Sequence, residues 1–140
     1  MPALTTPWAK RLVAAVAVLV LLDLTGGLIA VATDVNEIGS AWSAKARLAA
    51  PWPMILVQVA LTAAALLPRR GVAVSAASLL AGACLVSAIS GFFDGALAAE
   101  ELSAGHVVFQ VLLIAWTGLV GALAFLHVTG LVREPDPAQA

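Results

Sequence analysis

Asp23 is the residue whose type and position are best suited to chemistry, because it stands alone in a long apolar segment. It occurs within Leu21-Leu22-Asp23-Leu24, about ten residues before the segment ends. At 1.5 Å per helical residue this corresponds to a depth of about 15 Å, near the middle of a bilayer. An acid at that depth costs about 2.5–3.5 kcal/mol on insertion scales. We therefore expect Asp23 to face other helices and to have a polar partner.

Four other polar side chains are the candidate partners of Asp23 in an intramembrane polar site. They fall in the same half of the predicted helices, and they are Gln58, Ser87, His106 and Gln110. His106 and Gln110 are four residues apart, so they share one face of a helix. The expected rim of the site consists of Ser90, Asp94 and Trp52. This pattern predicts a polar funnel that opens toward one side of the membrane.

Three functions are open for such a site. In the first, Asp23 is a hydrogen-bonded acid in a non-catalytic bundle, which is an accessory subunit or handles small molecules or lipids. In the second, Asp23 carries a proton or a cation in a small transporter. In the third, Asp23, His106 and Gln110 carry out acid–base chemistry on a lipid-like substrate. The first is the leading interpretation, because the chain has no nucleotide-binding loop, serine elbow or paired-histidine motif.

The composition narrows the classes of protein and of partner. Of the 140 residues, 62% are hydrophobic and 11% are charged, whereas a soluble domain carries about 25% charged residues. The expected solvent of this chain is therefore lipid. A net charge of −1 offers no basic field for nucleic acid. Cys84 is the only cysteine, and His106 and His127 lie far apart on one segment, so we predict no metal site and no cofactor.

Four apolar segments must position the polar residues. They are residues 12–32, 51–67, 71–93 and 106–131. A bilayer core of about 30 Å needs about 20 helical residues and at least about 17, so the second segment is at the lower limit. Arg69-Arg70-Gly71 leaves room only for a tight antiparallel connection between the second and third segments. We predict an all-α membrane protein, with one four-transmembrane-helix bundle over residues 1–132 and a disordered cytoplasmic tail over residues 133–140.

The distribution of cations predicts the orientation of the bundle. With four spans, five of the seven cations fall on one side and two on the other, and they are Lys10, Arg11, Arg69, Arg70 and Arg133 against Lys45 and Arg47. Cations accumulate on the cytoplasmic side, so both termini are expected inside. The first segment also has the form of a signal peptide that ends at Ala30-Val31-Ala32. Its length and Asp23 favour a retained span.

The first outer loop, residues 33–50, is expected to contain a short interfacial helix. Asp34 and Glu37 have the spacing of a capping box. On a helix Ile38, Trp42 and Ala49 would share one apolar face. This pattern is typical of a helix that lies on the membrane surface.

Small residues four apart predict where the helices pack closely. Ser78 with Gly82 and Gly118 with Ala122 have this spacing, which lets two backbones approach. His127, near the end of the fourth segment, is expected to be an interfacial side chain.

Two short stretches resemble a known group of proteins. Ser90-Gly91-Phe92-Phe93-Asp94-Gly95 and His106-Val107-Val108-Phe109-Gln110 are similar to segments of small four-helix membrane proteins of high-GC bacteria that have no assigned function. The resemblance covers the last two spans and implies a multi-pass protein of the bacterial cytoplasmic membrane. The expected partners are the lipid bilayer, a second copy or another membrane protein, and a small hydrophobic ligand.

Overall fold

The chain folds into four α-helices. The computed structural model describes residues 7–93, 97, 100 and 102–133. Its helices are α1 (Pro7–Ala32), α2 (Trp52–Ala65), α3 (Arg70–Phe93) and α4 (Ala104–Arg133). The prediction of an all-helical chain with four helices is confirmed, and no strand occurs among the described residues. The predicted tail, apart from Arg133, and the predicted rim residue Asp94 lie outside the described residues.

Three of the helices are long and apolar enough to cross a membrane, namely α1, α3 and α4. Helix α2 is different, because its 14 residues extend only about 21 Å at 1.5 Å per residue. It begins after Pro51 and carries Pro53 in its first turn, where a missing N–H costs nothing. It ends where the backbone N–H of Leu66 turns back to the carbonyl of Ala63. Helix α2 is therefore shorter than the span of 17 residues predicted for this segment.

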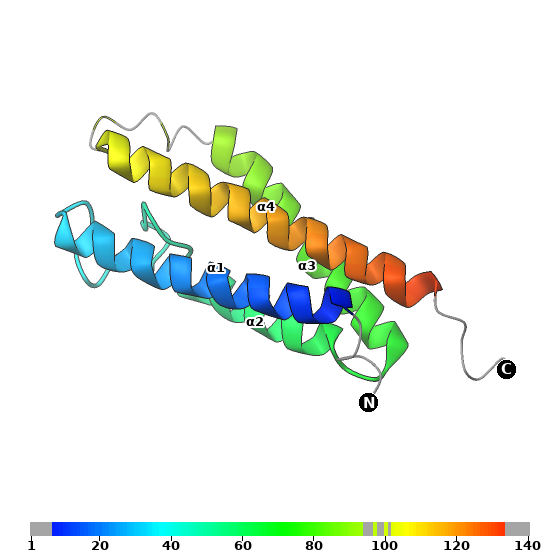
Figure 1. The fold of residues 1–140 in the computed structure, drawn as a ribbon. Coiled ribbons are helices and arrows are strands. Elements are labelled where there is room, and N and C mark those ends of the chain that lie inside the picture. The colour runs from blue at the N-terminus through cyan, green and yellow to red at the C-terminus, as the bar shows by residue number, and fades with distance from the viewer. Residues whose placement is uncertain (1–6, 94–96, 98–99, 101, 134–140) are drawn as a thin grey trace, which may run out of the picture.

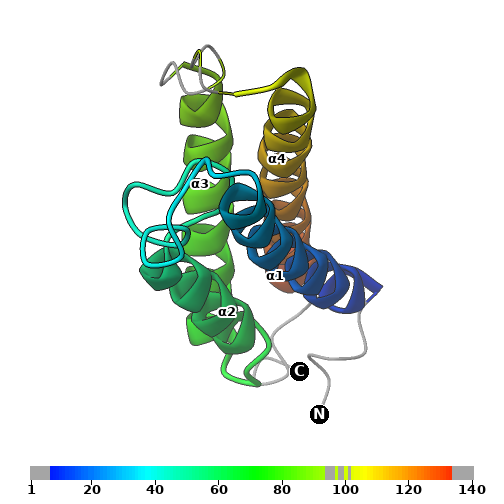
Figure 2. The same cartoon turned by 90° about the vertical axis from the view of Figure 1, so that its left-hand side faces the viewer.

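Each helix packs against the next one along the chain, and α4 also packs against α1, which closes the bundle. Helix α4 packs against α3 most extensively and against α1 next, while α2 packs on α3 and touches α1 least. The start of α1 and the end of α4 lie at the same end of the bundle, and the loop 33–51 lies at the other (Figure 1, Figure 2). We call these two ends the termini half and the loop half. The guanidinium of Arg70 fastens the termini half by donating to the carbonyl oxygen of Val132 at 2.9 Å.

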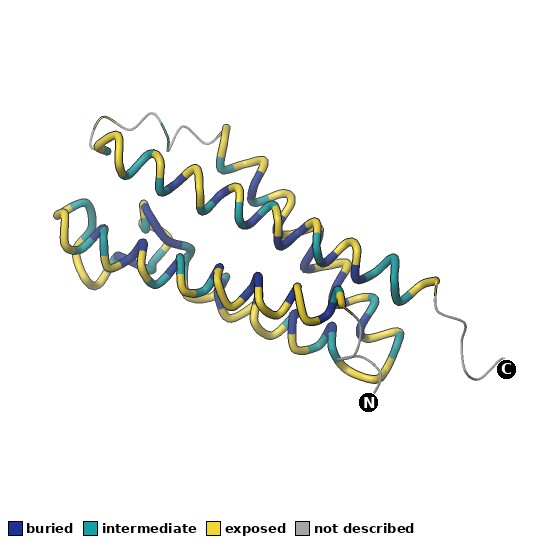
Figure 3. The backbone as a smooth tube through the Cα atoms, in the orientation of Figure 1, coloured by how far each residue is buried: buried dark blue, intermediate teal, exposed yellow. Residues whose placement is uncertain are grey.

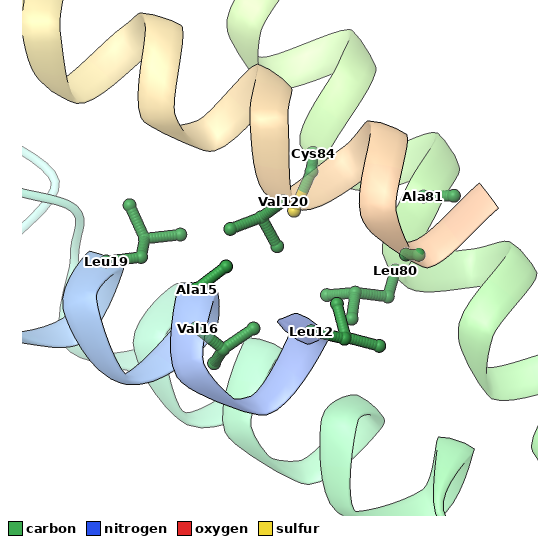
Figure 4. Close-up of a cluster of buried hydrophobic side chains, with 9 residues drawn as sticks. Leu12, Ala15, Val16, Leu19, Leu80, Ala81, Cys84 and Val120 are labelled. Atoms are coloured by element: carbon green, nitrogen blue, oxygen red, sulfur yellow. The ribbon is translucent and has the colours of Figure 1, made fainter. Parts of the chain in front are cut away.

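The hydrophobic core occupies the termini half. Apolar side chains from α1, α3 and α4 form one fully buried cluster, which consists of Leu12, Ala15, Val16, Leu19, Leu80, Ala81, Cys84, Val120 and Ala124. Figure 4 shows these side chains filling the space between the three helices. A smaller cluster of Ala65, Ala76 and Ala77 joins α2 to α3. The smaller cluster is all alanine, and small side chains of this kind let helix backbones approach closely.

Two polar side chains tie the termini half together. The indole N–H of Trp116 on α4 donates to the carbonyl oxygen of Ala15 on α1 at 2.9 Å. The Nε2 atom of His127 lies 3.1 Å from the carbonyl oxygen of Ala65, at the end of α2. His127 is 1% exposed, so the expectation of an interfacial side chain is wrong. A helix end leaves carbonyls without intrahelical partners, and His127 supplies one of them with a partner.

The small-residue spacing predicted from the sequence is only partly used. Gly118 does face Ala88 across the α3–α4 contact. Ser78, Gly82 and Ala122 are exposed, and a Cβ added at Gly82 would meet no atom within 4 Å. The close approach of α4 to α3 instead centres on Gly121, whose added Cβ would lie 2.9 Å from a side-chain carbon of Leu85. The spacing alone does not specify which of several faces is buried.

The interfacial helix predicted for the first loop does not form. Residues 33–51 fold as successive turns, with hydrogen bonds from Ser40 N to the carbonyl of Glu37 and from Ser43 N to that of Ser40. Asp34 has φ of 58°, whereas a helix N-cap needs a negative φ. Its N–H and that of Val35 bond back to carbonyls of the last turn of α1. Asp34 thus ends α1 in a Schellman-type motif and does not begin a second helix.

The outer surface of the bundle is apolar over the length of the helices. Large side chains such as Leu28, Leu56 and Ile89 are each more than 60% exposed. Figure 3 shows exposed positions recurring along the outward side of every helix. Soluble monomers rarely expose contiguous apolar surface of this extent. The surface agrees with the length and composition of the three candidate spans.

Candidate functional site

A cavity of about 620 Å³ occupies the loop half of the bundle. Its wall combines residues of all four helices with the loop, and the polar contributors are Asp23, Lys45, Arg47, Gln58, Ser87, Ser90, Gln110 and Thr117. Met54, Leu113 and Ile114 add apolar surface to the same wall. The side chains of Lys45 and Arg47 are exposed, so the cavity reaches the surface beside the loop. Its size falls within the range of small-molecule sites, about 300–1,000 Å³.

Asp23 is the buried acid of this cavity, and it is 1% exposed. Nine helical residues separate it from the end of α1 at Ala32, which corresponds to a depth of about 14 Å. Its carboxylate oxygen Oδ1 accepts a hydrogen bond from the backbone N–H of Ala50 at 2.8 Å. The second oxygen, Oδ2, is buried and has no donor among the described residues. Among the described residues, the side chain of Asp23 therefore bonds only to the loop backbone, and to none of the four side chains predicted as its partners.

The loop reaches Asp23 because α1 has two glycines one turn later. A Cβ on Gly26 would overlap the carbonyl oxygen of Leu48, and one on Gly27 would overlap the indole ring of Trp42. With hydrogen in place of a side chain, the loop lies directly on α1. The indole N–H of Trp42 then donates to the backbone carbonyl of Asp23 at 3.1 Å. Membrane proteins tolerate irregular backbone beside their spans where it is buried in protein or lines a cavity, and this loop lines a cavity beside the candidate span α1.

The side chain of Asn36 holds the loop in this shape. Its amide nitrogen donates to the carbonyl of Lys45 at 3.1 Å, and its oxygen accepts from the N–H of Arg47 at 3.0 Å. At the far end, the rings of Trp42 and Trp52 pack at a tilt of 35°, with their centroids 5.8 Å apart. The wall of the cavity is thus held from both ends by specific contacts.

Two glutamines complete the buried polar surface. Gln58 on α2 is 4% exposed and Gln110 on α4 is 8% exposed. The Oε1 oxygen of each is buried and has no hydrogen-bond donor among the described residues. Buried polar atoms in native proteins nearly always have a partner. Three residues of the cavity wall therefore each hold a buried oxygen without a donor among the described residues, counting Oδ2 of Asp23.

The structure brings most of the sequence-predicted site together. Asp23, Gln58, Gln110 and the two serines, Ser87 and Ser90, line the one cavity.

The remaining candidates lie elsewhere. His106 does not line the cavity, and its Nδ1 lies 3.2 Å from the backbone N–H of Ser103 at the start of α4. Trp52 packs at a tilt against Trp42 and is not part of the wall. Asp94 is outside the described residues. The trio of Asp23, His106 and Gln110 is therefore not assembled around one cavity.

Sequence reasoning missed the contribution of the loop. Ala50 provides the hydrogen bond to Asp23, and Trp42 covers Gly27, yet neither residue has a motif of its own. The available signal was the pair Gly26-Gly27 one turn after Asp23, because adjacent glycines in an apolar helix permit a close backbone approach. Thr117 also lines the cavity without a signal in the sequence.

Among the described residues, no group of three or more His, Cys, Asp or Glu side chains is placed to hold a metal ion. Comparison with protein-family models, with curated proteins and with solved structures found no match for the chain. The site must therefore be interpreted from its own geometry.

Proposed function

We propose that this protein is a non-catalytic integral membrane protein that binds a small molecule in the cavity around Asp23. The observation that carries the proposal is the cavity of about 620 Å³, whose wall includes three buried polar residues, Asp23, Gln58 and Gln110. Each of the three has a side-chain oxygen that lacks a donor among the described residues. A buried acceptor without a partner is destabilising by about 1–3 kcal/mol. Polar side chains kept at such a cost around a cavity favour a role in binding over a role in stability.

The two other functions have less support. Transport would need a path through the termini half, and the described part of that half is filled by the apolar cluster around Leu19, Leu80 and Val120. Acid–base catalysis with His106 would need that ring beside Asp23, and it lies instead against Ser103. A bundle that binds from the loop side agrees better with both observations.

We place the protein in a bacterial cytoplasmic membrane with both termini inside and α2 as a fourth, short span. The support is the five-to-two distribution of cations and the apolar surface of α2. In a Cys84→Ala background, Lys45→Cys should react with a membrane-impermeant maleimide in intact cells. Arg69→Cys should react only after lysis. The reverse labelling pattern would exclude this orientation.

Purification in mild detergent followed by native mass spectrometry tests the binding function. Wild-type protein should carry a small molecule or lipid that is lost from the Gln58→Leu/Gln110→Leu variant. The Gly82→Ala variant should retain it, since Gly82 is not part of the cavity wall and an added Cβ meets open space. Recovery of a protein partner with no small molecule would favour the accessory-subunit function instead. Proton-coupled flux in vesicles that Asp23→Asn abolishes would favour the transporter.

A further inference from the structure

A groove of about 530 Å³ lies between α1 and α2 in the termini half. Its lining is apolar apart from one hydroxyl and consists of Val13, Val16, Ala17, Val20, Leu21, Val59, Thr62, Ala63 and Leu66. The groove forms because α1 and α2 pack together less than any other pair of helices in contact. It shares no residue with the cavity around Asp23.

The groove offers no polar group to an occupant. The hydroxyl of Thr62 belongs to the only polar side chain of the lining, and it donates to the carbonyl oxygen of Gln58 within its own helix at 2.7 Å. Large apolar side chains on both walls, such as Leu21 and Val59, are exposed. A molecule that fills the groove therefore gains only apolar contact, which is what a hydrocarbon chain can use.

The length of the groove corresponds to most of one membrane leaflet. Along α1 it extends from Val13 to Leu21, about 12 Å at 1.5 Å per residue. Along α2 it extends from Leu66 back to Val59, and the start of α1 and the end of α2 lie at the same end of the bundle (Figure 1). A hydrocarbon core of about 30 Å gives each leaflet about 15 Å. An acyl chain that enters from the termini end would be covered over most of its leaflet.

Two exposed cations lie at the termini end of this groove. Ala17 and Leu21 follow Lys10 by about two and about three helical turns, so Lys10 lies on the groove face of α1. Arg69 follows Leu66 by three residues, in the connection from α2 to α3. The side chains of Lys10 and Arg69 are both exposed. A positive charge therefore adjoins each wall of the groove where it opens toward the membrane surface.

We propose that the groove holds one acyl chain of an anionic phospholipid, whose phosphate headgroup lies at Lys10 and Arg69. Basic pockets between transmembrane helices bind the headgroups of anionic lipids. The described residues of the surrounding segments, 7–22, 59–93 and 102–133, include no Asp or Glu that would compensate the two cations. This lipid site is separate from the site around Asp23 and goes beyond the function proposed for it.

Two other cations of the termini end are engaged away from the groove. The guanidinium of Arg11 lies 5.1 Å from the ring centroid of Trp8, and a Cβ added at Gly130 of α4 would lie 3.8 Å from a carbon of that ring. The guanidinium of Arg70 donates to the carbonyl oxygen of Val132 on α4 at 2.9 Å. Both contacts are made at the end of α4, which contributes no residue to the groove. The headgroup is therefore assigned to the remaining pair, on α1 and on the connection after α2.

Native mass spectrometry of the full-length protein in detergent tests the headgroup. The protein is titrated with phosphatidylglycerol or with phosphatidylcholine of the same acyl chains. Wild type should bind the first phosphatidylglycerol at least about tenfold more tightly, because each cation near the headgroup contributes about fivefold. The Lys10→Gln/Arg69→Gln variant should lose this preference. Arg133→Gln removes a cation from the same end of the bundle, but outside the groove, and should keep it.

The same titration tests the acyl chain. Ala17→Leu and Ala63→Leu enlarge exposed side chains on opposite walls of the groove and should each weaken the binding of both lipids by about fivefold or more. Ala83→Leu, the same change at an exposed alanine of α3 outside the groove, should bind like wild type. The Gln58→Leu/Gln110→Leu variant should also bind phosphatidylglycerol like wild type, which separates this site from the cavity.

Several outcomes would overturn the lipid assignment and leave the function proposed for the cavity intact. Equal binding of the two lipids by wild type would show that an anionic headgroup is not recognised. An equal loss in Arg133→Gln would assign a diffuse basic surface. Unchanged binding by Ala17→Leu and Ala63→Leu would place the chain outside the groove. Glycerol phosphate bound as tightly as the lipid would assign a free phosphate ligand, and dimers abolished by Ala63→Leu would assign the groove to a second copy.

Discussion

The two halves of this bundle differ in whether their buried polar side chains have hydrogen-bond partners. In the termini half, Trp116 and His127 each contact a specific backbone carbonyl, on Ala15 and Ala65, and apolar side chains fill the rest. In the loop half, an irregular segment replaces helix, and acceptors on Asp23 and other residues are left without donors. One half is organised for stability, and the other keeps unpaired groups at a cost to stability.

The contrast has its origin in the length of α2. Because α2 has only 14 residues, it cannot fill the bundle from one end to the other. The loop that precedes it occupies the remaining depth and lies on Gly26 and Gly27. The cavity forms where this segment meets α1, α3 and α4. Substitutions in the two halves should therefore change the stability of the protein by clearly different amounts.

The largest effect is expected for Gly26→Ala, which adds a Cβ where the Leu48 carbonyl and the Phe109 ring already lie. Backbone cannot move aside easily, so we expect the loop to leave α1, with a loss of about 3 kcal/mol or more. Gly121→Ala in the termini half places a Cβ 2.9 Å from Leu85 Cγ and 3.2 Å from the Ala81 carbonyl oxygen, and it should cost about 1–3 kcal/mol.

The stability of these glycine variants is measured by unfolding them with a denaturing detergent in mixed micelles. Gly82→Ala is the matched control, since it enters open space on a helix and should be at least as stable as wild type. An equal loss for Gly26→Ala and Gly82→Ala would show that the loop is not held against α1 in solution.

A smaller effect is expected for His127→Leu. The change removes the partner of the Ala65 carbonyl and leaves a buried acceptor unpaired, at a cost of about 1–3 kcal/mol. His127→Gln keeps a donor at the end of the side chain and should recover part of the loss. The same unfolding measurement applies. Full stability of His127→Leu would mean that the carbonyl finds another donor.

The smallest effect on stability is expected for Gln58→Leu and Gln110→Leu. Each replaces an unpaired buried acceptor with an apolar group of similar size, which is nearly neutral or stabilising. Both variants should melt at or above the wild-type temperature in detergent and lose ligand binding. Marked destabilisation by either variant would identify that glutamine as structural.

The sequence was sufficient to predict that Asp23 and the two glutamines are buried, because isolated polar residues in apolar segments must face the protein interior. It was not sufficient for the loop. The capping-box spacing of Asp34 and Glu37 favoured a helix, yet Asp34 adopts a positive φ and ends α1. Local patterns cannot report that the side chain of Asn36 and the indole of Trp42 find their partners elsewhere.

The amino-acid sequence by itself determined that the chain is helical, that three of its helices can cross a membrane and that one acid lies deep within the first of them. These properties follow from composition and from the need to satisfy every backbone group within its own helix. The tertiary structure decided which oxygen of Asp23 is occupied, because the N–H of Ala50 comes from 27 residues away. It also decided that His106 stands apart from the cavity while His127 is buried. Such choices depend on how helices of unequal length pack, and this is not encoded in any single segment.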